Sequence, residues 1–156
     1  MAGEYLADLI NHKRRVTGYM QLIANELYRR ARGHDISKFG PPEFEAFEQA
    51  FPALQKYAYG SEEYWAEIRK IKPAVQHHYA ANDHHPEFFA NGIDDMNLIQ
   101  VVEMVCDWIA SSERFQGDIG ASLKINRERF GISHQLHSVI GNTVECLIGR
   151  KPAALR

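Results

Sequence analysis

The chain has 156 residues, of which 45% are hydrophobic and 24% are charged. This length and composition fit one globular domain with its own core and exclude a disordered chain. The formal net charge is −2, and the middle of the chain is acidic, with twelve acidic against four basic side chains in residues 41–112. Basic residues gather only in short groups near the two ends, so we do not expect a nucleic-acid partner.

The sequence shows neither a run of 18 apolar residues nor the basic and apolar segments of a secretory signal. We therefore expect a cytoplasmic protein that makes no contact with a membrane. The two cysteines, Cys106 and Cys146, lie inside apolar helical patterns. We expect both to be reduced core residues, which suits the cytoplasm.

The hydrophobic periodicity of the first half is helical, and no alternating strand pattern occurs. A first helix is predicted from Tyr5 to Arg32, with an apolar stripe that should be buried. Two prolines at 41 and 42 should open a short helix that ends near Gln49, before an aromatic loop over residues 51–60. The next helix is predicted from Ser61 to Asn82, with a disturbance at Pro73.

In the second half, Asp94 or Asp95 should cap a strongly apolar helix that continues through Ser111. The last two helices are predicted over residues 119–130 and 133–148, with glycines as stops. The pattern as a whole predicts an all-α bundle of five or six helices. We expect a single domain over residues 1–149 and a flexible tail over residues 150–156.

Several ionisable residues occupy positions where the helical pattern expects apolar ones. His12 projects from the apolar stripe of the first helix, where a hydrogen-bonded core histidine or a metal ligand would fit. Gln100, Glu103 and Asp107 form one polar line along an otherwise apolar helix. That line is either the solvent face of the helix or a set of buried groups that needs a cation.

Further histidines and an aspartate gather at two helix ends. His34 and Asp35 could bind one ion together, or they could simply interact with the helix end as isolated residues. Four of the eight histidines lie within nine residues, at positions 77, 78, 84 and 85. On a continuous helix His78 and His85 would share a face, whereas the alternative is a wet turn with adventitious metal affinity. Imidazole and carboxylate groups together favour Zn, Mn, Fe, Ni or Co.

The order of these motifs resembles the HD-domain superfamily of metal-dependent phosphohydrolases, whose signature is an early histidine, a His-Asp pair and a distant aspartate. More closely, the chain resembles a family of short proteins, common in phages and bacteria, that share an HD-like core. The matching stretches are His12-Lys13, His34-Asp35-Ile36-Ser37-Lys38-Phe39, His78 with Asn82, His84-His85-Pro86-Glu87, and Glu103 to Trp108.

The resemblance implies a helical bundle around a divalent metal. The ligands that it implies for this ion are His12, His34, Asp35 and Asp107. A second ion could be held by His78 and by His85 or His84, with Asp35 between the two ions.

The activity that this resemblance implies is hydrolysis of a small phosphate ester, above all a nucleotide, by a metal-activated water. Asp35 belongs to the catalytic set. Lys38 could neutralise the phosphate, although a solvated lysine fits its position equally well. Glu103 could act as general base or orient a histidine ligand. Three residues are candidates for contact with the substrate, namely Ser37, Asn82 and Tyr79.

Two other functions stay open at this point. Some HD-type proteins with six His and Asp ligands hold two irons and oxidise their substrate with O₂. A non-catalytic helical interaction protein with a structural metal is the other alternative. The oligomeric state is also open, because the segment Phe51–Tyr64 and the last helix could each form an interface or part of the core.

Overall fold

The computed structural model describes residues 2–115 and 117–149, and the predicted tail, residues 150–156, lies outside them. The described residues form seven α-helices and three short 3₁₀ helices, without a strand. This confirms the all-α prediction, with seven helices in place of five or six. The chain divides into two compact units, Met1–His34 and Asp35–Arg156. None of the described helices combines the length and apolar character that spanning a bilayer requires.

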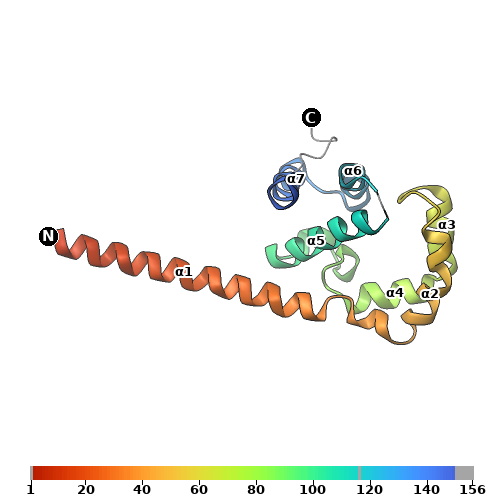
Figure 1. Cartoon of the computed structure of the whole chain (residues 1–156), viewed down its shortest axis with the longest axis horizontal. Helices are drawn as coiled ribbons and strands as arrows, with labels where there is room; N and C mark the ends of the chain where they lie inside the picture. Colours follow the sequence, from red (N-terminus) through yellow and green to blue (C-terminus); the bar gives the residue numbers. More distant parts are fainter. Residues whose placement is uncertain (1, 116, 150–156) are drawn as a thin grey trace. The chain divides into compact units, whose positions relative to one another are not determined.

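The first unit is a single long helix, α1 (Ala2–Gly33), drawn in red and orange in Figure 1. Its apolar side chains are exposed, with 47% of Leu9 and 49% of Ile23 accessible to solvent. The prediction that this stripe is buried is not met within this unit, because the unit is one helix and contains no other element to pack on it. His12 is exposed on the same helix.

The second unit begins with the 3₁₀ helix η1 (Ile36–Phe39), followed by α2 (Glu43–Leu54), α3 (Glu62–Lys70) and α4 (Lys72–Ala81). α2 continues past its predicted end, so the aromatic loop is shorter than expected. The single helix predicted from residue 61 to 82 is two helices, because the chain turns at Ile71. Pro73 lies in the first turn of α4, where a proline needs no backbone donor.

Two more 3₁₀ helices, η2 (Pro86–Phe88) and η3 (Gly92–Asp95), lead into α5 (Leu98–Arg114). Asn97 caps α5, in place of the two aspartates that the sequence suggested. Its side chain accepts hydrogen bonds from the backbone of Ile99 and Gln100, and the Gln100 side chain accepts one from the Asn97 backbone. The bounds of α6 (Ile119–Phe130) and α7 (His134–Ile148) confirm the prediction.

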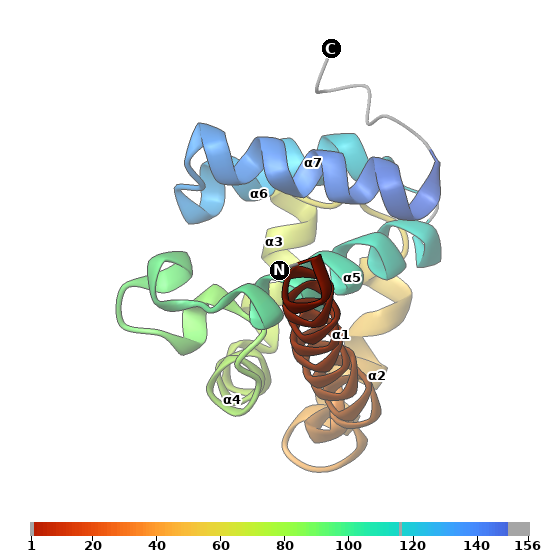
Figure 2. The ribbon, with the colours of Figure 1, turned by 90° about the vertical axis from the view of Figure 1, so that its left-hand side faces the viewer.

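The core of the second unit lies among its last three helices. α6 and α7 lie on one side of α5, and α4 lies on the other side (Figures 1 and 2). Trp108 stacks on Phe130 beside this core, with ring centroids 6.1 Å apart. Both cysteines are exposed, so the prediction that they are core residues is wrong. The buried core residues are Ile93, Val101, Met104, Val105, Leu123, Ile132, Ile140 and Val144.

The loop between α2 and α3 lies against α6. Gly60 in this loop has a φ of 87°, in the left-handed region that glycine adopts without strain. A Cβ atom at this position would lie 2.8 Å from Cδ1 of Ile125 on α6. The neighbouring Tyr59 hydroxyl donates a 2.6 Å hydrogen bond to Asn126 on the same helix. The positive φ therefore favours glycine where this loop meets α6, and a side chain there would also require the Ile125 side chain to move.

Candidate metal centre

Asp35 opens the second unit in an unusual backbone conformation. Its φ of 55° lies in the left-handed region, which few residues other than glycine adopt and which is frequent at functional sites. One carboxylate oxygen, Oδ2, accepts a 2.6 Å hydrogen bond from Nζ of Lys38. The other oxygen, Oδ1, lies 3.4 Å from Nε2 of both His78 and His84. The carboxylate is thus directed at two imidazoles by a sharp turn of the chain.

Three histidines converge on Asp35. His78 comes from the last turn of α4, and His84 and His85 come from the segment that follows it. The Nε2 atoms of His78 and His85 lie 2.8 Å apart. The four residues each offer one ligand atom, and these four atoms all lie within 4.8 Å of one another. One carboxylate oxygen and three imidazole nitrogens so close together suit a divalent transition metal.

The end of α4 explains why His84 and His85 both reach this cluster. The helix ends at Ala81, and Asn82 is extended. His85 is also extended, as expected for a residue that precedes a proline. The helical face that His78 and His85 were predicted to share therefore does not exist. A turn after α4 brings both histidines back toward it instead.

Glu43 sets the orientation of the histidine doublet on α4. The side chain is fully buried, and its Oε2 lies 2.8 Å from Nδ1 of His78. Its Oε1 lies 2.7 Å from Nδ1 of His77, whose side chain is 47% exposed. A carboxylate that accepts a hydrogen bond from Nδ1–H keeps the proton on that nitrogen and leaves the lone pair of Nε2 for a metal. His78 is thus the member of the doublet that faces the cluster, and His77 is not.

The ionisation of these groups agrees with a metal site. Burial alone would raise the pKa of Glu43, but hydrogen bonds from His77 and Ser37 outweigh burial and hold that pKa below its usual value. Burial lowers the pKa of His85, and the neighbouring His84 lowers it further. Burial and then Lys38 lower the pKa of His78. The imidazoles of His78 and His85 therefore favour their neutral form, which is the form that binds metal.

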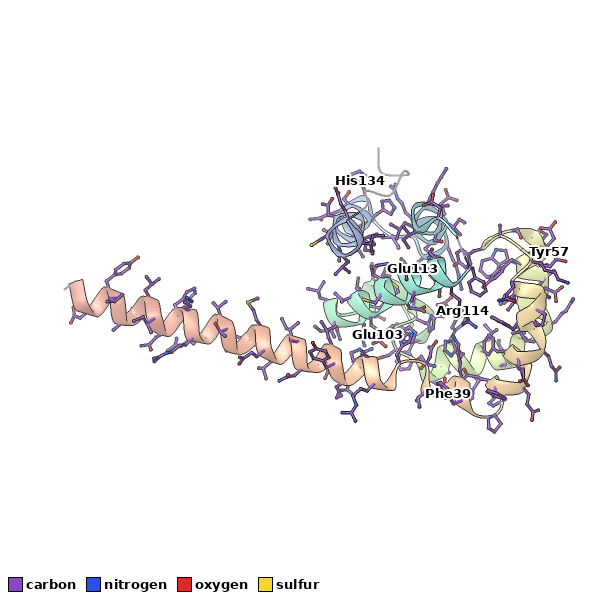
Figure 3. The ribbon with its side chains drawn as sticks, in the orientation of Figure 1. Phe39, Tyr57, Glu103, Glu113, Arg114 and His134 are labelled. Carbon is purple, nitrogen blue, oxygen red and sulfur yellow. The ribbon has the colours of Figure 1, made fainter. Side chains whose placement is uncertain are left out.

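The polar line on α5 faces into the second unit, not toward solvent. Glu103, whose side chain is 10% exposed, places Oε1 3.4 Å from Nδ1 of His84. Figure 3 shows Glu103 on the side of α5 that is turned away from α6 and α7. The buried Gln100 donates a 2.6 Å hydrogen bond to Asp83, next to His84 in the chain. Asp107, the last residue of the line, has a carboxylate oxygen within 4.8 Å of one of Asp35. The alternative of a plain solvent face is therefore wrong.

Ser37 and Asn82 lie beside Nδ1 of His78, the ring nitrogen that is directed away from the cluster. Nδ2 of Asn82 donates to Oγ of Ser37 and to the backbone oxygen of His78, at 2.8 Å in each case. Both residues thus contact His78, and their predicted contact with substrate stays a prediction. His12 and His34 belong to the first unit, and their part in metal binding stays a prediction.

Sequence reasoning missed Glu43 and Arg129. Acidic residues are common in the first turn of any helix for electrostatic reasons, so nothing in the sequence distinguishes Glu43. Arg129 lies in the last turn of α6, where basic residues are equally common. Their roles depend on contacts between elements that are distant in the chain.

A family model described as a family of unknown function (DUF5662) matches residues 1–149. The chain belongs to this family. The match to DUF5662 includes the whole first unit, residues 35–149 of the second unit and every residue of the cluster. No curated protein and no solved structure matches the chain. Membership of DUF5662 names no activity, so the chemistry of the centre rests on the four converging side chains and their partners.

Proposed function

We propose that this protein is a metal-dependent phosphohydrolase whose ion is bound by Asp35, His78, His84 and His85. The observation that carries the proposal is the approach of one carboxylate oxygen and three imidazole nitrogens to within 4.8 Å of one another. The resemblance of the motifs to HD-domain phosphohydrolases supports a phosphate ester, and in particular a nucleotide, as the substrate.

The residues around the cluster have separate tasks in this proposal. A divalent metal bound there lowers the pKa of a bound water and polarises a phosphoryl oxygen. Glu43 and Glu103 orient His78 and His84 through their Nδ1 atoms. Lys38, with 38% of its side chain exposed, can contact both the Asp35 carboxylate and a phosphate oxygen. Asp107 adds a second carboxylate near Asp35, where negative charge attracts a cation.

Metal content is the first test. We expect near-stoichiometric metal in the wild type after reconstitution with Mn, Zn, Fe, Co or Ni, measured by elemental analysis. His78→Ala and Asp35→Ala should lose this metal. His134→Ala is the matched control, because His134 is exposed on α7 and should leave the metal content unchanged. Wild type without metal under every condition would contradict the proposal.

Phosphate release is the second test. The panel consists of deoxynucleoside mono- and triphosphates, cyclic dinucleotides and an aryl phosphate, each with every metal that binds. We expect release by the wild type and none by His78→Ala. Turnover that needs iron and consumes O₂ would instead identify the di-iron oxygenase.

A structural metal is the second candidate function. It is favoured by the burial of two of the ligands, since only 4% of the His78 side chain and 3% of the His84 side chain are exposed. A structural site has a closed ligand set, whereas a catalytic site keeps a position for water. A melting temperature that falls strongly with a chelator, together with no phosphate release across the panel, would establish this function and exclude the hydrolase.

A further inference from the structure

Arg129 on α6 contacts four other segments of the second unit. Its Nη1 donates to the Tyr59 hydroxyl at 3.1 Å, and its Nη2 donates to the Tyr79 hydroxyl at 2.9 Å and to a carboxylate oxygen of Glu87. The guanidinium also lies over the ring of Trp65, 4.9 Å from its centroid. Hydrogen bonds at its edges and a ring on its face leave the planar guanidinium little freedom to rotate. Arg129 therefore fixes the hydroxyl groups that it contacts.

The hydroxyl groups of Tyr59 and Tyr79 differ in whether they donate a hydrogen bond. Tyr59 donates its proton to Oδ1 of Asn126, at 2.6 Å. Tyr79 accepts from Arg129 and donates to no acceptor among residues 2–115 and 117–149. A phenol carries one proton to donate and can accept at the same time. The Tyr79 hydroxyl is thus a fixed donor whose proton is available to a ligand.

Tyr79 also borders the candidate metal centre. It follows His78 directly in α4, and its ring centroid lies 5.0 Å from that of His85. The ring is therefore in contact with one proposed ligand and adjacent in the chain to another. A ligand bound to the metal would lie close to this side chain.

We propose that Tyr79 donates a hydrogen bond to the ester oxygen of the bound phosphate ester, and that Arg129 is the positioning residue for this hydroxyl. This inference rests on the proposed function. In the hydrolysis the water oxygen bonds to phosphorus and loses a proton to solvent, the ester P–O bond breaks, and the departing oxygen takes its proton from solvent. Negative charge grows on the departing oxygen, and a donor fixed in advance stabilises that charge.

The geometry also points to a substrate class. An alkoxide accumulates more negative charge as it leaves than an aryl oxide does, so it gains more from a fixed donor. Tyr79 should therefore matter for alkyl phosphates, such as the sugar esters of nucleotides. It should matter little for aryl phosphates, whose leaving group is already stable as an anion.

The experiment compares Tyr79→Phe with wild type on a deoxynucleoside monophosphate and on p-nitrophenyl phosphate. We expect kcat/KM for the nucleotide to fall about 100-fold, and for the aryl ester by less than about tenfold. Arg129→Lys should show the same selective loss, because lysine keeps the charge but lacks the planar fork. Tyr64→Phe is the matched control, since Tyr64 belongs to the same aromatic group but takes no part in the hydrogen bonds of Arg129 to Tyr59, Tyr79 and Glu87, and should leave both rates unchanged.

Equal losses on the two substrates would indicate a merely structural role and would overturn the inference, as would no loss on either. A binding measurement supplies a second readout. The phosphonate analogue of the nucleotide, with CH₂ in place of the ester oxygen, offers Tyr79 no acceptor, so wild type and Tyr79→Phe should bind it equally in calorimetry. A weaker affinity of Tyr79→Phe for this phosphonate would overturn the assignment to the ester oxygen.

The outcomes separate this inference from the proposed function. If wild type hydrolyses both substrates and Tyr79→Phe has the same kcat/KM on each, only the role proposed for Tyr79 is wrong. If wild type hydrolyses neither substrate with any metal, the proposed function is wrong and the inference falls with it.

Discussion

Glu43 shares its two carboxylate oxygens between His77 and His78 while it is fully buried. Glu43→Gln should weaken metal binding about 10- to 100-fold, because the amide has one accepting oxygen for two imidazoles and its nitrogen cannot accept a hydrogen bond from Nδ1–H of a histidine. Competition with a chromophoric chelator measures this change in affinity. Glu45→Gln is the control, because Glu45 is exposed on the same helix. Equal affinities of the two variants would show that Glu43 does not orient the ligand.

The histidine cluster makes the metal-free protein sensitive to acid. Burial and neighbouring imidazoles lower the pKa of His85 in the folded chain. Below its ordinary pKa of about 6.5, the unfolded chain therefore takes up a proton that the folded chain does not. The free energy of unfolding should fall as the pH drops below that value, by at most about 1.4 kcal/mol per pH unit for this histidine.

Urea unfolding of metal-free protein between pH 7.5 and pH 5 checks this dependence. His85→Asn removes the titrating group and should flatten the decline. A wild type whose stability is constant or rises toward pH 5 would contradict the assignment of a neutral, buried imidazole.

At the scale of single residues, the sequence predicted the ligand types better than their partners. The density of histidines between 77 and 85 predicted a cluster without knowledge of the fold. Which histidine of each adjacent pair reaches the cluster depends on where α4 ends and on the contact of His78 with Glu43, which lies 35 residues earlier in the chain. No local pattern encodes a contact across that distance, so this choice needed the structure.

At the scale of elements, the capping box at the start of α5 supports the helix that carries Glu103 and Asp107. Asn97→Ala should lower the free energy of unfolding by about 1 kcal/mol, because the first backbone donors of the helix lose their acceptor. Chemical denaturation measures this change. Asn142→Ala is the control, since Asn142 is exposed within α7 and its replacement removes no cap. If Asn142→Ala lowers the free energy of unfolding as much as Asn97→Ala does, the loss of the cap is not the cause.

Elements with local signals at both ends were predicted at their true bounds. α6 and α7 begin after a capping aspartate and a capping serine, and each ends at a glycine with a φ of 63°. The predicted start of α5 was wrong by a few residues, because Asp94, Asp95 and Asn97 are all residue types that can cap a helix. The prediction that the apolar stripe of α1 is buried failed for another reason. Periodicity shows that a helix has an apolar face, but it does not show what covers that face.

At the scale of the whole molecule, the core and all four proposed ligands lie in the second unit. A chain that begins at Asp35 should therefore unfold cooperatively and still bind metal. Thermal unfolding and elemental analysis of this truncated chain check both expectations. If it folds but loses metal, the His12 and His34 ligands that the HD-type signature implies would be required.

The backbone of Gly60 restricts this loop position to glycine, because its φ of 87° strains any residue that has a Cβ atom. A Cβ atom there would also displace the end of the Ile125 side chain on α6, next to Asn126, which holds the Tyr59 hydroxyl. In a saturation library scored for thermal stability, every substitution at position 60 should therefore lower the melting temperature, even though Gly60 contributes no reactive group.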